Sequence, residues 1–169
     1  MGVFKRNGRA DPDGLDWQIL QNGWTNLYWR VSILDGDLKW FEKENYVIVE
    51  FNCKTWDNDK IMHSQLKEKL NFPDYYGENF NALSDCLSDL NIIKTGFVFV
   101  FRHLDNIDKR TAHAILDIVA DSARLHMLFG NRIITLAQVD NPDYEIDPLG
   151  QTTAQWNGQE WLNSRRQKE

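Results

Sequence analysis

Three short runs of the chain are almost continuously apolar and rich in β-branched and aromatic residues. They lie at 46–53 (YVIVEFNC), at 96–101 (GFVFVF) and at 132–139, within NRIITLAQV. Such runs predict strands, and the unbroken run at 96–101 suits a strand buried on both faces. Apolar residues recur at helical spacing in three further stretches, near 59–70, 78–90 and 110–127. Strands that alternate with helices predict an α/β protein with a mostly parallel β-sheet packed by helices.

The chain before the first of these strands predicts an addition to that layout. Strand-forming residues flank Asn22-Gly23, a pair that suits a tight turn, so a β-hairpin is expected at 17–31. This hairpin should add at least one strand to the sheet or its edge. Ser32 and Asp35 then have the spacing of a capping box, which predicts a short helix after the hairpin.

The sequence therefore divides into three expected parts. Residues 1–45 form an N-terminal extension, a hairpin plus a short helix, that packs on the core. Residues 46–140 hold the alternating strands and helices. Residues 141–169 contain Gly and Pro breaks, two tryptophans and a charged end, which predict a C-terminal extension that wraps the core.

Composition narrows the class of protein. Of 169 residues, 42% are hydrophobic and 26% are charged, as in an ordinary soluble globular domain. The formal net charge of −6 argues against a general nucleic-acid binder and suits a basic partner, although mild acidity that only favours solubility explains it equally well. No apolar run is long enough to span a membrane, and the basic start lacks the apolar region of a signal peptide. Cys53 and Cys86 have no CxxC partner, which indicates reduced thiols and a cytoplasmic location.

Motifs of the common catalytic and cofactor sites are missing. The sequence has no phosphate-binding glycine loop, no GxSxG elbow and no histidine spacing of a zinc site, so no cofactor and no metal is expected. His113 and Asp117 have helical pair spacing, which a solvated pair explains as well as a metal or acid–base pair does. Four aspartates on two predicted helices would form a carboxylate cluster if the helices are neighbours: Asp85, Asp89, Asp117 and Asp121. Such a cluster could hold a cation or transfer protons, but solvated acidic faces are the simpler explanation.

The strongest functional signal is the stretch NFPDYYGENFNALSDCLSDL at 71–90. It predicts a loop that contains Tyr75, Tyr76 and Gly77 and runs into a helix. One face of this helix is apolar, and another carries Asn81, Ser84, Asp85 and Ser88. Tyrosine is a favoured interface anchor, glycine allows close backbone approach, and a carboxylate accepts hydrogen bonds from Arg or Lys. The plainer alternative is that both tyrosines pack over the core and the aspartate is merely solvated.

The same stretch closely resembles the barstar family, the intracellular inhibitors of secreted bacterial ribonucleases of the barnase type. The hallmark of that family is a Pro-acidic-Tyr-Tyr-Gly-x-Asn loop that leads into a helix with x-Ala-Leu-x-Asp-Cys. The positions that match are Pro73, Asp74, Tyr75, Tyr76, Gly77, Asn79, Ala82, Leu83, Asp85 and Cys86. The resemblance implies a barstar-like layered fold, and the predicted element order from Tyr46 to Val139 resembles the family layout more weakly. The two terminal extensions gain no support from it.

The resemblance also implies a mode of action. In the family, the loop and helix plug a ribonuclease active site, and the aspartate before the cysteine, here Asp85, takes the place of the substrate phosphate. Tyr75 would stack on the nuclease, and a carboxylate of the long helix, placed at Asp121 by counting along it, would also contact the enzyme. The implied partner-binding set is Tyr75, Tyr76, Gly77, Asn79, Asn81, Ser84, Asp85, Ser88 and Asp121. An inhibitor of this kind needs neither catalysis nor a cofactor.

Two residues of the implied contact face depart from the family pattern. An interface aspartate of the best-known member becomes Asn81, and an interface tryptophan becomes Ser84. Since these changes remove charge and packing, the target need not be a barnase-like enzyme. Three hypotheses follow: an inhibitor or immunity protein for a basic ribonuclease, a barstar-like module with a non-nuclease protein partner, and an enzyme that uses the carboxylate cluster. Direct contact with nucleic acid or a membrane is not expected.

Overall fold

The computed structural model describes residues 13–167 and confirms the predicted α/β class. The start of the expected N-terminal extension, before residue 13, lies outside the described residues. The strands are β1 (Thr25–Tyr28), β2 (Val47–Asn52), β3 (Phe97–Arg102), β4 (Ile133–Gln138) and β5 (Gln155–Trp156). The α-helices are α1 (Leu15–Gln21), α2 (Val31–Lys43), α3 (Asp59–Leu70), α4 (Phe80–Ser88) and α5 (Lys109–Leu128). Short 3-10 helices lie at Cys53–Thr55, Leu104–Asn106 and Asn163–Arg166.

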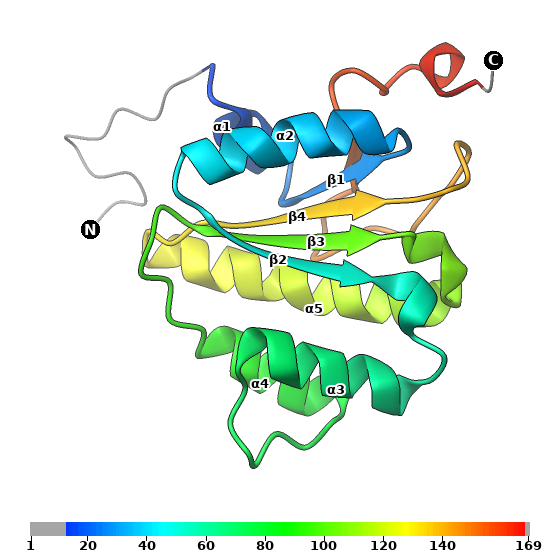
Figure 1. Cartoon of the computed structure of the whole chain (residues 1–169). Helices are drawn as coiled ribbons and strands as arrows, with labels where there is room; N and C mark the ends of the chain where they lie inside the picture. Colours follow the sequence, from blue (N-terminus) through cyan, green and yellow to red (C-terminus); the bar gives the residue numbers. More distant parts are fainter. Residues whose placement is uncertain (1–12, 168–169) are drawn as a thin grey trace.

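The five strands form one sheet in the order β2-β3-β4-β1-β5, and all four neighbouring pairs are parallel. Helices cover both faces of this sheet (Figure 1): α1 and α2 lie on one face, and α3, α4 and α5 lie on the other. None of the helices within residues 13–167 is both long and apolar enough to cross a membrane.

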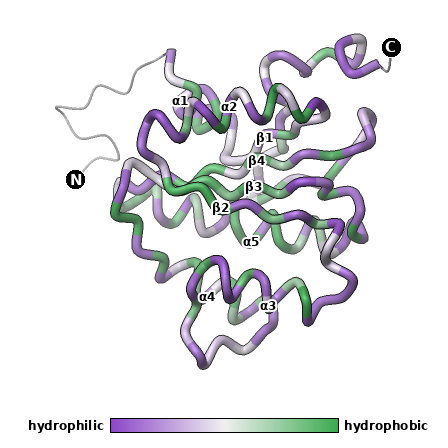
Figure 2. Tube along the Cα trace, viewed as in Figure 1, coloured by the Kyte–Doolittle hydropathy of each residue, from purple (hydrophilic) through white to green (hydrophobic). Residues whose placement is uncertain are grey.

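The central strands divide the core into two clusters, because successive side chains of a strand point to opposite faces. In β3, Phe99 and Phe101 join the cluster under α3, α4 and α5, whereas Val98 and Val100 join the cluster under α1 and α2. The chain turns from hydrophobic to hydrophilic toward the carboxyl ends of β2, β3 and β4 (Figure 2). The unbroken apolar run at 96–101 is thus explained by burial on both faces, as predicted.

The predicted hairpin at 17–31 is wrong. Its first half forms the helix α1, and only its second half forms a strand, β1, which pairs in parallel with β4 and β5. Asn22 is the C-cap of α1, and Gly23, with a φ of 114°, follows it. The positive φ that the Asn-Gly pair favours is therefore used to end a helix and not to close a hairpin.

Two smaller expectations also change. The helix after β1 is present as α2, but Arg30 is its N-cap and no side chain caps it, so the predicted capping box of Ser32 and Asp35 does not form. The strand β2 was expected to be mostly buried, yet only Phe51 is buried. Since β2 lies at one edge of the sheet, one of its sides lacks a neighbouring strand.

The C-terminal segment is fastened to the sheet by polar contacts. The Glu160 side chain, which is fully buried, accepts hydrogen bonds from the backbone N–H groups of Trp29 and Arg30 at 3.0 and 2.9 Å. The Arg166 guanidinium donates to the backbone oxygens of Pro142 and Glu160, and it stacks over the Trp156 ring. These contacts hold the end of the described chain against β1 and the start of α2.

Candidate functional site

The loop before α4 is fixed to the helix by Asn79. This residue is the N-cap of α4: its side-chain oxygen accepts a hydrogen bond from the Ala82 backbone N–H at 2.9 Å. Its side-chain amide also donates to the Gly77 carbonyl at 3.0 Å. Glu78, between them, has a φ of 49°, a conformation that is uncommon for a residue other than glycine. Asn79 therefore sets the path of the loop as well as the start of the helix.

The two tyrosines of the loop have different environments. Tyr75 is 85% exposed, whereas Tyr76 is 5% exposed and belongs to the hydrophobic core. The Tyr76 hydroxyl lies 2.6 Å from Nδ1 of His63, and its ring packs against Phe72. Burial raises the pKa of Tyr76 well above its usual range and lowers that of His63. The ring of Tyr75 is open to a partner, whereas the ring of Tyr76 is buried and packs under the loop, so a contact of Tyr76 with a partner stays a prediction.

The inner side of α4 is anchored at both of its buried leucines. Leu83 and Leu87 are each 1% exposed and pack into the core cluster below the sheet. The Leu87 carbonyl accepts a hydrogen bond from the Ser122 hydroxyl at 3.0 Å, and it lies 2.9 Å from Nε2 of His126. A carbonyl only accepts, so this histidine nitrogen carries the proton. The last turn of α4 is thereby fixed on α5.

The outer side of α4 presents the predicted polar groups. Asn81, Ser84 and Asp85 are exposed, and at about 100° per residue they lie opposite Leu83 and Leu87. Ser88 is half-buried, and its hydroxyl donates to the Ser84 carbonyl at 2.9 Å, so it is turned back onto its own helix. The structure brings together an exposed tyrosine loop and a helix face with one central carboxylate.

Asp121 lies on a different side of α5 from the residues that hold α4. It is exposed, it pairs with Arg124 at 3.6 Å, and its carboxylate borders Gly150 in the C-terminal segment. Its contact with a partner of α4 stays a prediction.

His113 and Asp117, which have helical pair spacing on α5, also face the C-terminal segment. Asp117 accepts a hydrogen bond from the Gly150 backbone N–H at 2.7 Å, and Nε2 of His113 donates to the Pro148 carbonyl at 3.0 Å. Both side chains are thus used to hold this segment on α5. In residues 13–167 no three His, Cys, Asp or Glu side chains are grouped as metal ligands would be.

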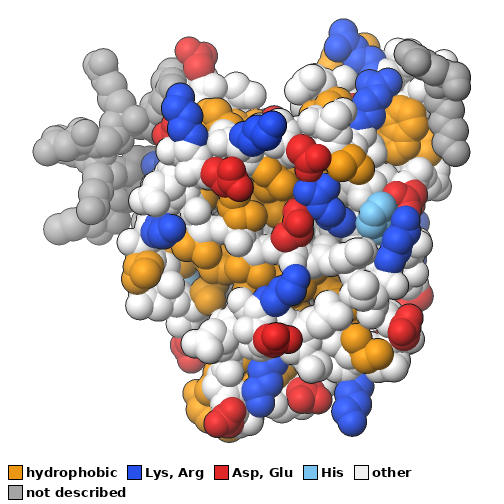
Figure 3. All heavy atoms as spheres, viewed as in Figure 1, with side chains coloured by type: hydrophobic (Ala, Val, Ile, Leu, Met, Phe, Trp, Pro, Cys, Tyr) orange, Lys and Arg blue, Asp and Glu red, His pale blue; other side chains and the backbone are white. Residues whose placement is uncertain are grey.

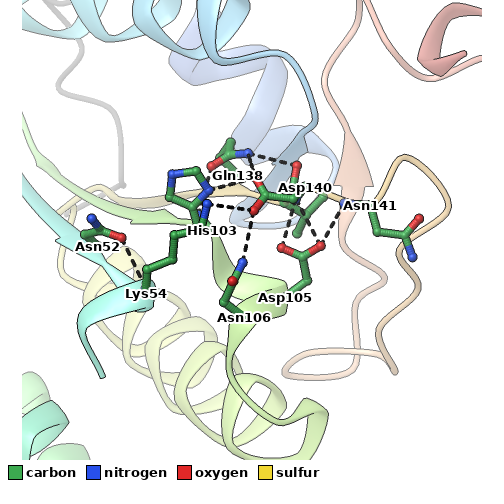
Figure 4. Close-up of polar contacts among 9 residues, drawn as sticks. Asn52, Lys54, His103, Asp105, Asn106, Gln138, Asp140 and Asn141 are labelled. Atoms are coloured by element: carbon green, nitrogen blue, oxygen red, sulfur yellow. Dashed lines mark hydrogen bonds and ion pairs between the residues drawn. The ribbon is translucent and has the colours of Figure 1, made fainter. Parts of the chain in front are cut away.

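A second polar cluster, which the sequence did not predict, joins the carboxyl ends of β2, β3 and β4 (Figure 4). Asp140 lies 2.7 Å from Nδ1 of His103, accepts from Asn106 at 3.0 Å and pairs with Lys54 at 3.2 Å. Burial alone would raise the pKa of Asp140, but hydrogen bonds from His103, Gln138 and Asn106 outweigh it and hold that pKa well below its usual range. These groups satisfy one another, so the cluster ties strand ends together. Lys54 and Asp140 are 86 residues apart, and no local pattern could reveal the cluster.

Comparison with known proteins agrees with this geometry. The family described as "Barstar (barnase inhibitor)" matches residues 46–130, about half of the chain, from the start of β2 past the end of α5. The chain belongs to the barstar family. It is also 51% identical over 35 residues to a Bacillus subtilis (strain 168) protein named "Putative ribonuclease inhibitor YrdF". That match covers 21% of this chain and 38% of the relative.

The barstar match includes the loop and α4 but not every strand of the sheet. β1, β4 and β5, together with α1 and α2, lie outside the matched residues. The barstar part supplies the candidate contact surface, while the flanking segments supply three of the five strands of the sheet, β1, β4 and β5.

Proposed function

We propose that this protein is a barstar-like inhibitor, or immunity protein, that blocks the active site of a ribonuclease toxin with α4 and the preceding loop. The observation that carries the proposal is the placement of Asp85. Its side chain is exposed on a helix whose opposite side is held by two fully packed leucines and whose last turn is bonded to α5. A carboxylate on so rigid a support can be presented in one orientation.

The chemistry of the target explains why a carboxylate would inhibit it. A ribonuclease active site must hold a phosphodiester, so it gathers Arg and Lys side chains. A carboxylate that replaces the phosphate forms charge-assisted hydrogen bonds with those cations. Opposite charge also speeds association, for which the barnase–barstar pair is the standard example. An inhibitor that acts this way needs no catalytic step, and it protects the compartment that contains the cell's own RNA, so the proposal includes a cytoplasmic location.

The proposed contact surface consists of the exposed members of the predicted set. Tyr75, Gly77, Asn79, Asn81, Ser84 and Asp85 form its centre, and Asp121 is an outlying contact. Acidic and basic side chains are interspersed on the face shown in Figure 3, so the net charge does not form one acidic patch there. Selection of a basic partner would therefore rest on the local arrangement around α4.

The test is titration of the protein into a panel of secreted bacterial ribonucleases, with cleavage of a fluorogenic RNA as the readout. Inhibition of at least one enzyme is expected, and Asp85→Ala should weaken that complex by about 2–5 kcal/mol, because the enzyme's cations would be left buried and unpaired. Thermal melts should show little change in the free variant, since exposed substitutions usually shift stability by less than about 0.5 kcal/mol. Glu42→Ala, an exposed acid on the other side of the sheet, is the control and should inhibit as the parent does. Equal inhibition by Asp85→Ala would refute the phosphate-mimic mechanism.

A second candidate is a barstar-like module that binds a protein other than a nuclease. It is favoured by Asn81 and Ser84, which replace an acid and a ring of the family's contact face. A stable complex with a purified non-nuclease, lost in Asp85→Ala, together with no inhibition across the ribonuclease panel, would support this candidate over the first.

A further inference from the structure

A cavity of about 380 Å³ lies on the face of the sheet opposite α4. Its walls come from α1, β1, α2, β5 and the segment that follows β5, all outside the residues that match the barstar family. Small-molecule sites in proteins have volumes of about 300–1,000 Å³, so the cavity falls within that range. The barstar surface on α4 does not explain it.

Three of the amide side chains that line the cavity each donate a side-chain N–H to a backbone carbonyl. Gln18 donates to the Asp13 carbonyl at 3.2 Å, and Asn22 donates to the Gln18 carbonyl at 3.0 Å. Asn157 likewise donates to the Leu27 carbonyl at 3.1 Å. Backbone carbonyls only accept, so these contacts identify the side-chain nitrogens of Gln18 and Asn22. Their side-chain oxygens accept no hydrogen bond within residues 13–167, so they are available as acceptors on residues that line the cavity.

Asp37 adds a charged acceptor. One oxygen of its carboxylate accepts a hydrogen bond from the Tyr28 hydroxyl at 2.7 Å, and within residues 13–167 the other oxygen has no hydrogen-bond partner. Burial raises the pKa of this carboxyl, the bond from Tyr28 offsets part of that rise, and the nearby charge of Glu160 adds to it. Asp37 is also the one ionisable side chain among the described residues that line the cavity. The site therefore offers acceptors and negative charge, and it lacks a cation of its own.

Trp161 supplies a flat apolar wall. It lines the cavity and is 63% exposed, which is unusual for so large a ring. A guanidinium group fits this combination: it is planar, it stacks on aromatic faces, it carries five N–H donors, and it has no acceptor. An ammonium group would match the charge but not the flat wall.

We propose that this cavity binds a guanidinium group, which pairs with the Asp37 carboxylate, donates to the Gln18 and Asn22 oxygens and stacks on Trp161. This site is separate from the proposed nuclease-blocking surface, and its test does not depend on that function. The group could belong to a free small molecule or to an arginine side chain of a bound polypeptide, since both present the same chemistry.

The experiment compares isosteres that differ in charge. Ethylguanidine and the neutral ethylurea are titrated into the full-length protein, and binding is followed by the NMR signal of the Trp161 indole N–H, assigned with Trp161→Phe. The guanidine should bind about tenfold more tightly than the urea, because hydrogen bonds to a charged partner are worth more than neutral ones. The blocked tripeptide acetyl-Gly-Arg-Gly-amide, beside its citrulline counterpart, gives the second arm: tighter binding than ethylguanidine identifies a polypeptide arginine as the source, and weaker binding a free small molecule.

Asp37→Asn should abolish the preference for guanidine over urea, because it keeps the shape of the side chain and removes the charge. Glu42→Gln removes an exposed acid from the same helix outside this cavity and should leave the preference intact. Equal affinity of the parent for the two isosteres would overturn the proposal, and so would an undiminished preference in folded Asp37→Asn. The comparison on the parent decides the question even if that variant does not fold.

Discussion

At the scale of single residues, neighbours in the α4 region serve opposite purposes. Tyr75 and Tyr76 are adjacent and chemically identical, yet the first is open to solvent and the second is buried against His63. The sequence shows that both tyrosines stand in a loop, which is compatible with contact or with packing. Only the path of the loop, set by Asn79 and by the positive φ of Glu78, decides which ring turns inward.

This difference predicts unequal responses to loss of one hydroxyl. Tyr76→Phe leaves the His63 nitrogen buried without its partner, so the free energy of unfolding should fall by about 1–3 kcal/mol. Tyr75→Phe changes an exposed side chain and should alter it by less than about 0.5 kcal/mol. Urea denaturation of both variants measures the two values. If Tyr76→Phe lowered the free energy of unfolding no more than Tyr75→Phe does, the hydrogen bond between Tyr76 and His63 would not stabilise the fold.

The replaced residues on α4 predict target preference. If the natural partner is not barnase-like, the unaltered protein should inhibit a barnase-type ribonuclease poorly. Asn81→Asp combined with Ser84→Trp restores an acid and a ring on the exposed face, so inhibition should improve through added charge attraction and packing. Steady-state inhibition constants of parent and double variant give the comparison, with Ser88→Trp as a control for added apolar area alone. Tight inhibition by the parent would show that these two replacements matter little.

At the scale of elements, the sequence correctly predicted helices whose formation depends on residues close together in the chain. The helix α3 was expected near 59–70 and spans Asp59–Leu70, because amphipathic spacing and the Asn58 cap act within a few residues. The predicted hairpin failed because Trp17, Ile19 and their neighbours suit a strand and a short helix equally well. Burial of Ile19 and Leu20 under α2 favours the helix, and that contact depends on the tertiary fold. Prediction of the site had the same limit, because the sequence identified the motif residues but not which of them are buried.

The caps of α3 and α4 allow a matched test of how α4 is presented. Asn58 and Asn79 each accept a hydrogen bond from the third residue beyond them, at 3.0 and 2.9 Å. Asn79→Ala and Asn58→Ala should therefore both lower the free energy of unfolding by about 1 kcal/mol. Only Asn79→Ala should also weaken the complex with an inhibited nuclease, because Asn79 fixes the Gly77 carbonyl and with it the loop. Thermal melts and binding calorimetry on the same samples separate the two effects, and equal binding by both variants would mean that the loop does not need this support.

At the scale of the whole molecule, the flanking segments are structural parts of the sheet. The sequence suggested an N-terminal extension packed on a core and a C-terminal extension wrapped around it. In the structure, β1 lies between β4 and β5, so chain ends that are distant in sequence are neighbours in the sheet. Parallel pairing of this kind cannot be predicted from the short runs themselves, because it joins residues more than a hundred positions apart. The barstar surface therefore stands on a sheet that both ends of the chain complete.

Glu160 offers a test of whether the C-terminal segment is a structural part of the fold. Its buried carboxylate accepts two backbone N–H groups just before α2, a helix start that no other side chain caps, and negative charge is favourable at that end of a helix. Glu160→Ala would leave both part-buried N–H groups without this partner, so the free energy of unfolding should fall by about 2–3 kcal/mol. Arg165→Ala, at an exposed position of the same segment, should change it by less than about 0.5 kcal/mol. Urea denaturation followed by far-ultraviolet circular dichroism gives both values. A Glu160→Ala protein as stable as its parent would mean that the C-terminal segment is only an attachment, and that the part of the chain that matches the barstar family is stable without it.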